Sequence, residues 1–172
     1  MRPAATRAEP PLRLARRLAI DYGERRVGLA ISDPTGTIAS PAGHILRRPG
    51  KRPPVAEIIR RAEALEAQGF VLGLPLDEEG GETARTREVR AVAEALRTRT
   101  GLPVSLVDER YTTAIALRAI RELGGSTRGR AGDVDSLAAT VLLQHALALP
   151  AEGTGDDGAP HAHDIGSEGT GR

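Results

Sequence analysis

The chain has 172 residues, of which 40% are apolar and 2% aromatic, and its net formal charge is +1. This length suits one domain with an aliphatic core. The scarcity of aromatic side chains argues against recognition of single strands by base stacking. The nearly neutral charge excludes a strong overall attraction to nucleic acid, so any such attraction must come from local clusters of arginine. No cysteine is present, which excludes disulfides, zinc–thiolate sites and cysteine nucleophiles.

Both ends of the chain lack the periodicity of helices and strands. Residues 1–15 are rich in Pro, Ala and Arg, and residues 151–172 in Gly and Asp. We therefore expect a disordered N-terminal extension, one folded domain over residues 16–150 and a disordered C-terminal tail. No apolar run is long enough to span a membrane, and the basic N-terminus lacks the apolar segment of a secretory signal. The sequence thus predicts a cytoplasmic protein that does not contact membranes.

A β-hairpin is expected near the start of this domain. Two short apolar runs, Leu18–Ile20 and Val27–Ile31, lie on either side of a polar turn. Gly23 in that turn is expected to adopt positive φ. Asp21 would then end the first strand, at the rim of a sheet where a metal or a phosphate could meet it. Asp is also common in turns because of its local hydrogen bonds, so this position alone does not indicate a site.

A third strand and a basic loop follow the hairpin. The turn at residues 33–36 leads into an expected strand at 37–46, whose Pro41 and Gly43 suit an edge position or a bulge. The three strands would form an antiparallel meander. The loop at residues 47–52 then carries four cations, Arg47, Arg48, Lys51 and Arg52.

The rest of the chain alternates helices with strands. A helix is expected from Pro53 to a C-terminal cap at Gly69, with Pro54 also in its first turn. The fully apolar run Phe70–Leu76 is typical of a central strand. One face of the helix carries apolar residues at helical spacing, namely Val55, Ile58, Ile59, Ala62 and Leu65.

The C-terminal half continues this alternation. After an acidic, flexible loop at 77–82, a second helix is expected over 83–100, followed by a buried strand at 103–107. A third helix is expected over 112–123, and a final helix over 133–149 after a mobile basic loop. The residues expected to face inward are Val89, Val92, Ala93 and Leu96 in the second helix and Val134, Leu137, Ala138, Val141 and Leu142 in the final helix. Together these elements predict an α/β fold. Its mixed five-stranded sheet would combine a three-stranded antiparallel meander with two parallel strands, flanked by helices.

Three carboxylates occupy positions where a site could form. Asp21 ends the first strand, Glu109 follows the last strand, and Asp135 lies in the first turn of the final helix. Ligands of α/β proteins gather at strand ends. On a helix, Asp135 shares a face with Ala139 and Leu142, so it borders the side that packs onto the sheet, where a carboxylate needs a partner.

Each carboxylate also has an ordinary explanation, but together they predict a metal site. Asp135 could stabilise a helix N-terminus, and Glu109 could pair with Arg110 or another neighbour. If all three converge, each pair ~4 Å apart repels by about 4 kcal/mol at an effective dielectric of 20, unless cations fill the gap or one carboxylate is protonated. A ligand set of oxygen without Cys or His indicates Mg²⁺ or Mn²⁺. Two such ions, ~3.5 to 4 Å apart, would activate water and stabilise the leaving oxygen of a phosphodiester.

Four segments of the chain resemble, in order, the motifs of a known family. This is the YqgF family of pre-16S rRNA nucleases, relatives of the RuvC Holliday-junction resolvases with an RNase H-like fold. The resemblance runs from about Leu18 to Leu149. It departs from the pattern at Tyr111, where a smaller aliphatic residue is expected, and in the loop before Asp135, which is rich in Gly and Arg rather than Lys. The matching segments are Ile20–Gly23 with Arg26–Ala30, Val71–Leu76, Asp108–Thr113 and Val134–Ala139.

The resemblance implies a hydrolase that uses two metal ions. Asp21, Glu109 and Asp135 would be its metal-binding catalytic carboxylates, with Mg²⁺ or Mn²⁺ as the cofactor. It also implies processing of the 5′ end of pre-16S rRNA in the cytoplasm, as a step of ribosome biogenesis, with DNA junctions as a second possible substrate. The arginines expected to contact the nucleic-acid backbone are Arg26, Arg110, Arg128 and Arg130.

Two other functions fit parts of the sequence. A non-catalytic nucleic-acid-binding or ribosome assembly factor could have the same fold. A sugar or nucleotide kinase related to actin is the other alternative, because Asp21–Gly23 also resembles the first phosphate loop of that group. The chain length argues against a kinase, since such enzymes need two domains of this kind. No feature of the sequence indicates an oligomeric state.

Overall fold

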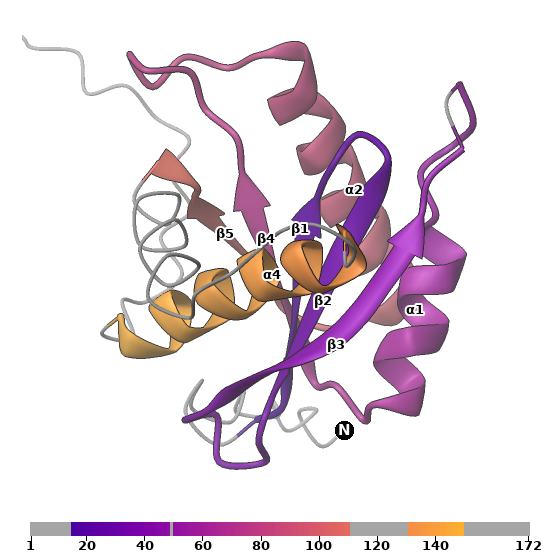
Figure 1. The fold of residues 1–172 in the computed structure, drawn as a ribbon. Coiled ribbons are helices and arrows are strands. Elements are labelled where there is room, and N and C mark those ends of the chain that lie inside the picture. Colours follow the sequence, from indigo (N-terminus) through magenta and orange to yellow (C-terminus); the bar gives the residue numbers. More distant parts are fainter. Residues whose placement is uncertain (1–14, 49, 111–130, 150–172) are drawn as a thin grey trace, which may run out of the picture.

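A computed structural model describes residues 15–48, 50–110 and 131–149, with the backbone alone for 131–134. Its five strands form one mixed sheet in the order β3-β2-β1-β4-β5 (Figure 1). Strands β1, β2 and β3 form an antiparallel meander, and β1, β4 and β5 run parallel. The predicted fold class is confirmed. The strands are β1 (Arg17–Tyr22), β2 (Arg26–Ser32), β3 (Ala39–Leu46), β4 (Gly69–Leu74) and β5 (Val104–Asp108).

Helices cover both faces of this sheet. Helices α1 (Val55–Ala64) and α2 (Ala84–Thr100) pack on one face, and α4 (Ala131–Ala148) crosses the other (Figure 1). The helix expected at 112–123 lies outside the described residues.

The two faces of the sheet carry side chains of different size. Because successive residues of a strand point to opposite faces, Leu18 and Ile20 of β1 join the large core beneath α1 and α2. Ala19 between them, with Ala30 of β2 and Val71 of β4, faces α4 instead. Small residues on that face allow the helix to lie close to the strands.

The predicted hairpin is present, but its turn differs from the prediction. Asp21 and Tyr22 belong to β1, and Asp21 lies opposite Gly28 of β2. Gly23 is not among the described residues with positive φ, so that prediction was wrong. Glycine is required there for another reason, since a Cβ atom at position 23 would lie 2.4 Å from the carbonyl oxygen of Arg26.

The edge position predicted for the third strand is confirmed. Strand β3 pairs only with β2 among the described strands, and its register shifts between Gly28 and Ala30 of that neighbour. Gly43 has φ +81° within the strand. Strand β5 was expected to be buried, but only Val104 is fully so. The other four residues are half-buried because β5 pairs with β4 alone within the described sheet.

The first helix is shorter than predicted. Pro54 precedes it as the N-cap and Leu65 is its C-cap. Gly69 opens β4 instead of capping the helix, so the predicted cap was wrong. The chain reverses at Glu66, which adopts φ 54°. The bounds predicted for α2 hold within one residue: Thr83 caps its N-terminus and Gly101, with φ 67°, caps its C-terminus.

Helix α4 begins at Ala131, two residues earlier than expected. Asp135 therefore lies beyond the first turn, where the helix dipole stabilises a carboxylate less. Leu142 is buried as predicted, together with Ser136, Ala139 and Leu143. Leu137, Ala138 and Val141 were also expected to face inward but are only half-buried, and the side chain of Val134 is not described. The reason is that this helix is apolar nearly all round, so periodicity does not select one face.

The left-handed residue Glu66 predicts a stabilising substitution. In Glu66→Gly we expect the free energy of unfolding to rise by about 1 kcal/mol, because a side chain disfavours this conformation. Glu63→Gly, at an exposed right-handed position in the last turn of α1, is the control and should lower it, by about 1 kcal/mol at most. Urea unfolding monitored by circular dichroism would measure both. A decrease for Glu66→Gly would contradict the prediction.

Candidate active site

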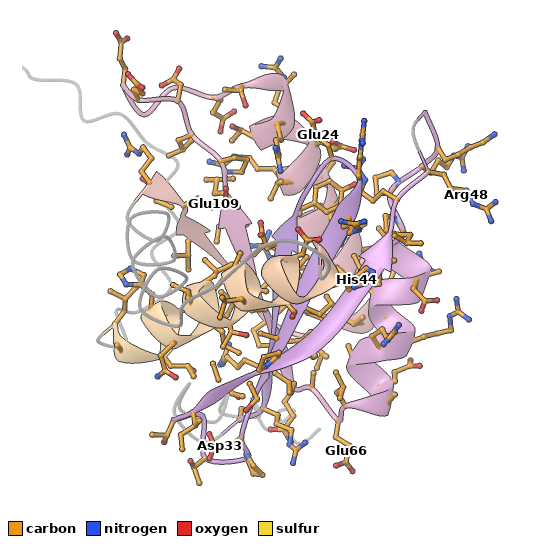
Figure 2. All side chains as sticks on the ribbon, viewed as in Figure 1. Glu24, Asp33, His44, Arg48, Glu66 and Glu109 are labelled. Carbon is orange, nitrogen blue, oxygen red and sulfur yellow. The ribbon has the colours of Figure 1, made fainter. Side chains whose placement is uncertain are left out.

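The predicted acidic residues lie at the end of the sheet where β1, β4 and β5 finish. Asp21 points to the α4 side of the sheet, two residues after Ala19 on the same strand. Glu109 follows β5 directly. Figure 2 shows Glu109 at this end of the sheet, with Asp33 and Glu66 at the opposite end.

A glycine brings Asp135 to Asp21. Gly28 is the partner of Asp21 across the β1–β2 ladder. A Cβ atom on Gly28 would lie 2.0 Å from the backbone oxygen of Asp135. The backbone of α4 therefore rests on β2 beside Asp21, and the Asp135 charge acts on the Asp21 carboxyl group.

A second glycine makes room for Glu109. Gly73 of β4 is next after Leu72, the neighbour of Ile20 in β1. A Cβ atom on Gly73 would lie 2.3 Å from Oε1 of Glu109. The Glu109 carboxylate thus lies over the backbone of β4, on the side of the strand that adjoins Asp21. Its backbone N–H donates to the carbonyl oxygen of Leu74 at 3.2 Å, which fixes the start of the segment after β5.

These surroundings favour the protonated form of two carboxyl groups. Burial raises the pKa of Asp21; the Arg85 charge lowers it, and the Asp135 charge raises it again. Burial raises the pKa of Glu109 to about 7, helped by the negative charges of Asp21 and Asp108 and opposed by Arg85. The structure therefore links all three acidic residues, because Asp21 interacts electrostatically with each of the other two.

Two arginines supply positive charge here. Arg85, which the sequence analysis did not identify, donates from Nη2 to the carbonyl oxygen of Tyr22 at 2.8 Å. Its signal in the sequence was a cation in the first turn of α2, where the helix dipole favours an acidic residue. Arg26, predicted as a nucleic-acid contact, has Nη1 3.7 Å from Oδ2 of Asp135.

The other predicted arginines are placed differently. The Arg110 guanidinium binds Asp108, with Nη2 2.6 Å from Oδ2, and lowers the pKa of that carboxyl group. Much of its hydrogen-bonding capacity is therefore already directed to its own loop. Arg128 and Arg130 lie outside the described residues.

The donor atoms of this site suit a hard divalent cation. Oδ2 of Asp135 is buried and has no hydrogen-bond partner within the described part of the chain, and its ion pair with Arg26, at 3.7 Å, is longer than a hydrogen bond. This oxygen is therefore open to a cation, which would lower the cost of burying its charge. All three side chains offer oxygen, the ligand that Mg²⁺ and Mn²⁺ prefer. Within the described ranges, no group of three or more His, Asp or Glu side chains is already arranged to hold an ion. The carboxylates are thus neighbours that fit the cation chemically without forming a closed set of ligands.

The mixed five-stranded sheet with helices on both faces is the architecture of the RNase H-like fold. The structure is similar to T. thermophilus RuvC in complex with a Holliday junction substrate, with a TM-score of 0.50 and 16% identity over 77% of this chain and 93% of that one. At this identity the similarity establishes the fold alone.

The chain belongs to the RuvX family, also called YqgF, which is described as "Holliday junction resolvase" and matches residues 15–149. A Clavibacter michiganensis protein named "Putative pre-16S rRNA nuclease" is 41% identical over 136 residues, covering 79% of this chain and 84% of that protein. A Kineococcus radiotolerans protein of the same name is 45% identical over 140 residues, covering 81% and 73%. The predicted family and fold are confirmed, and with them the enzyme class, a hydrolase of phosphodiester bonds.

The two glycines predict substitutions with different consequences. Gly73→Ala should displace the flexible Glu109 carboxylate towards solvent, lowering its pKa from about 7 towards its usual range with little loss of stability. In Gly28→Ala the added methyl group would meet the backbone of Asp135, which cannot move aside as a flexible side chain can. This substitution should therefore lower the free energy of unfolding by about 1 to 3 kcal/mol. Carboxylate titration by NMR and urea unfolding would measure these effects. Equal destabilisation by both substitutions would contradict the assignment.

The raised pKa of Glu109 predicts a pH dependence of stability. Between about pH 4.5 and 7 the folded protein holds a proton on Glu109 that the unfolded chain has lost, so the free energy of unfolding falls as pH rises. The Glu109→Gln variant has no carboxyl group at position 109, so its stability lacks this dependence on pH. In a metal chelator, urea unfolding across that range should therefore show the wild type losing stability relative to Glu109→Gln. Parallel curves for the two proteins would contradict the prediction.

Proposed function

We propose that this chain is a metal-dependent nuclease that hydrolyses phosphodiester bonds in structured RNA and processes the 5′ end of pre-16S rRNA. The observation that carries this proposal is the gathering of Asp21, Glu109 and Asp135 at one end of the sheet, where Gly28 and Gly73 make room for them. The names of the Clavibacter and Kineococcus relatives support the substrate. Processing of ribosomal RNA would place the protein in the cytoplasm. None of the helices in the described ranges is long and apolar enough to cross a membrane.

Asp21, Glu109 and Asp135 are the residues that would hold Mg²⁺ or Mn²⁺. When bound, such ions supply an activated water and neutralise negative charge at the phosphodiester. Burial and mutual repulsion raise the pKa values of Asp21 and Glu109 because both make a charged carboxylate costly. A bound cation would lower both costs, so these carboxylates are suited to binding one.

The chain's own groups position the reaction. The contact between Gly28 and the backbone of Asp135 fixes α4 against β2, which sets the place of the Asp135 carboxylate. Arg85, anchored on Tyr22, offsets part of the negative charge. Arg26, whose side chain is 37% exposed beside Asp135, is the candidate that could donate to a backbone phosphate at the edge of this site.

Cleavage of DNA junctions is a second candidate function. It is favoured by the description of the family as Holliday junction resolvases. The same acidic residues would serve either substrate, because the scissile phosphodiester has the same charge in RNA and DNA. Only a direct comparison of the two substrates separates these candidates.

Replacing one carboxylate tests the proposed chemistry. We expect Asp21→Asn to abolish cleavage of a pre-16S transcript in Mg²⁺ or Mn²⁺ and to weaken Mn²⁺ binding measured by calorimetry. RNA affinity measured in a chelator should remain. The fold should also remain, because the buried charge of Asp21 opposes folding.

The control is Glu63→Gln, the same change of a carboxylate to an amide on the exposed face of α1. It should leave cleavage and Mn²⁺ binding intact. A four-way DNA junction, assayed in parallel, shows which substrate is cut. Full activity in Asp21→Asn would exclude the metal role, and a wild-type protein that binds precursor RNA but cuts neither substrate would indicate an assembly factor.

A further inference from the structure

The connection between β3 and α1 carries positive charge that the proposed active site does not use. Arg48, Lys51 and Arg52, here called the basic arm, are all exposed. Figure 1 shows this connection projecting beyond the sheet, and Figure 2 shows Arg48 pointing away from the fold. Within the described ranges none of the three forms an ion pair, whereas Arg60 and Arg61 on α1 both pair with Glu57.

The base of the arm is held firmly by Arg47. Its side chain, only 14% exposed, places Nη2 2.6 Å from Oε1 of Glu88 in α2. Nη1 donates to the carbonyl oxygen of Gly23 at 2.8 Å, and the guanidinium lies 4.3 Å from the centre of the Tyr22 ring. A loop that served only solubility would not need this anchoring.

This anchoring joins the arm to the strand that carries Asp21. The Arg47 N–H donates to the carbonyl oxygen of Arg25 at 2.8 Å, in the turn that follows β1. Arg25 is itself exposed, next to the exposed Glu24. In Figure 2, Arg48 and Glu109 lie towards the same end of the sheet but beside its opposite edges, β3 and β5. A polyanion that reached the carboxylates could therefore extend across the β1–β2 turn to the arm.

We infer that the basic arm binds the phosphodiester backbone of the nucleic-acid substrate beside the active site. The inference rests on the proposed function. Arginine forks and the lysine ammonium match phosphate oxygens without reading bases. The binding should therefore be independent of sequence and strongly dependent on salt, because each contact releases counterions. The arm would bind the sugar-phosphate backbone of either RNA or DNA, and the test below shows which of the two it binds.

The test removes three charges from the arm and, in a control, three from the surface of α1 and α2. The arm variant is Arg48→Gln/Lys51→Gln/Arg52→Gln. The matched control is Arg60→Gln/Arg61→Gln/Arg99→Gln, with three exposed arginines of α1 and the C-terminal end of α2. Binding of labelled pre-16S RNA and of a four-way DNA junction would be measured by fluorescence anisotropy in a chelator, from low to physiological salt, with the full chain.

We expect the arm variant to bind at least about tenfold more weakly. The slope of log affinity against log salt should fall by about two to three, while the control keeps the wild-type slope. The nucleic acid on which the slope changes is the one that the arm binds. An unchanged slope for the arm variant on both, or an equal fall in the control, overturns the inference. The proposed function still stands in that case if Asp21→Asn alone abolishes cleavage. A wild-type protein that binds neither RNA nor DNA overturns both.

Discussion

The contact between the backbone of α4 and Gly28 is the constraint on which the site depends. No side chain separates helix from strand there, since even a Cβ atom would lie 2.0 Å from the Asp135 oxygen. Ala19, Ala30 and Ala139 continue this close packing below the site. Beside the site the helix is held chiefly by this close packing, which positions the Asp135 carboxylate. Farther along α4, the Gln144 side chain adds hydrogen bonds to the segment that leads into β3.

That close packing explains how a small domain maintains repulsive charges. Burial of the Asp21 and Glu109 carboxyl groups, together with the repulsion between Asp21 and its two acidic neighbours, raises the pKa values of both groups, so the charged forms oppose folding. The large core beneath α1 and α2, on the other face of the same strands, offsets this cost through the burial of residues such as Ile20, Phe70 and Leu72. Stability and chemistry are therefore assigned to opposite faces of one sheet.

The sequence predicted what depends on local pattern. Alternation and apolar runs gave the strands, and the chain order of Asp21, Glu109 and Asp135 supported the family. It did not predict what depends on the approach of distant backbones. Gly23 and Gly28 are needed for steric room and not for positive φ, and nothing local distinguishes these roles. The inward face of α4 was predicted correctly only in part, because the helix is apolar nearly all round. Arg85 comes near the carboxylates only once α2 packs on the sheet.

The β1–β2 hairpin connects the proposed metal-binding carboxylates with the basic arm through the alternation of a single strand. Asp21 points towards α4, while its neighbour Tyr22 points into the opposite core, where its hydroxyl donates to Glu88 at 3.1 Å. Arg47 binds the same Glu88 oxygen and stacks on the Tyr22 ring. Any displacement of β1 that moved Asp21 would thus also strain the anchor of the basic arm. Adjacent residues on one strand therefore fix the position of the carboxylates relative to the cations of the arm. In this way a chain with a net charge of only +1 presents an acidic site and a basic surface at the same end of the sheet.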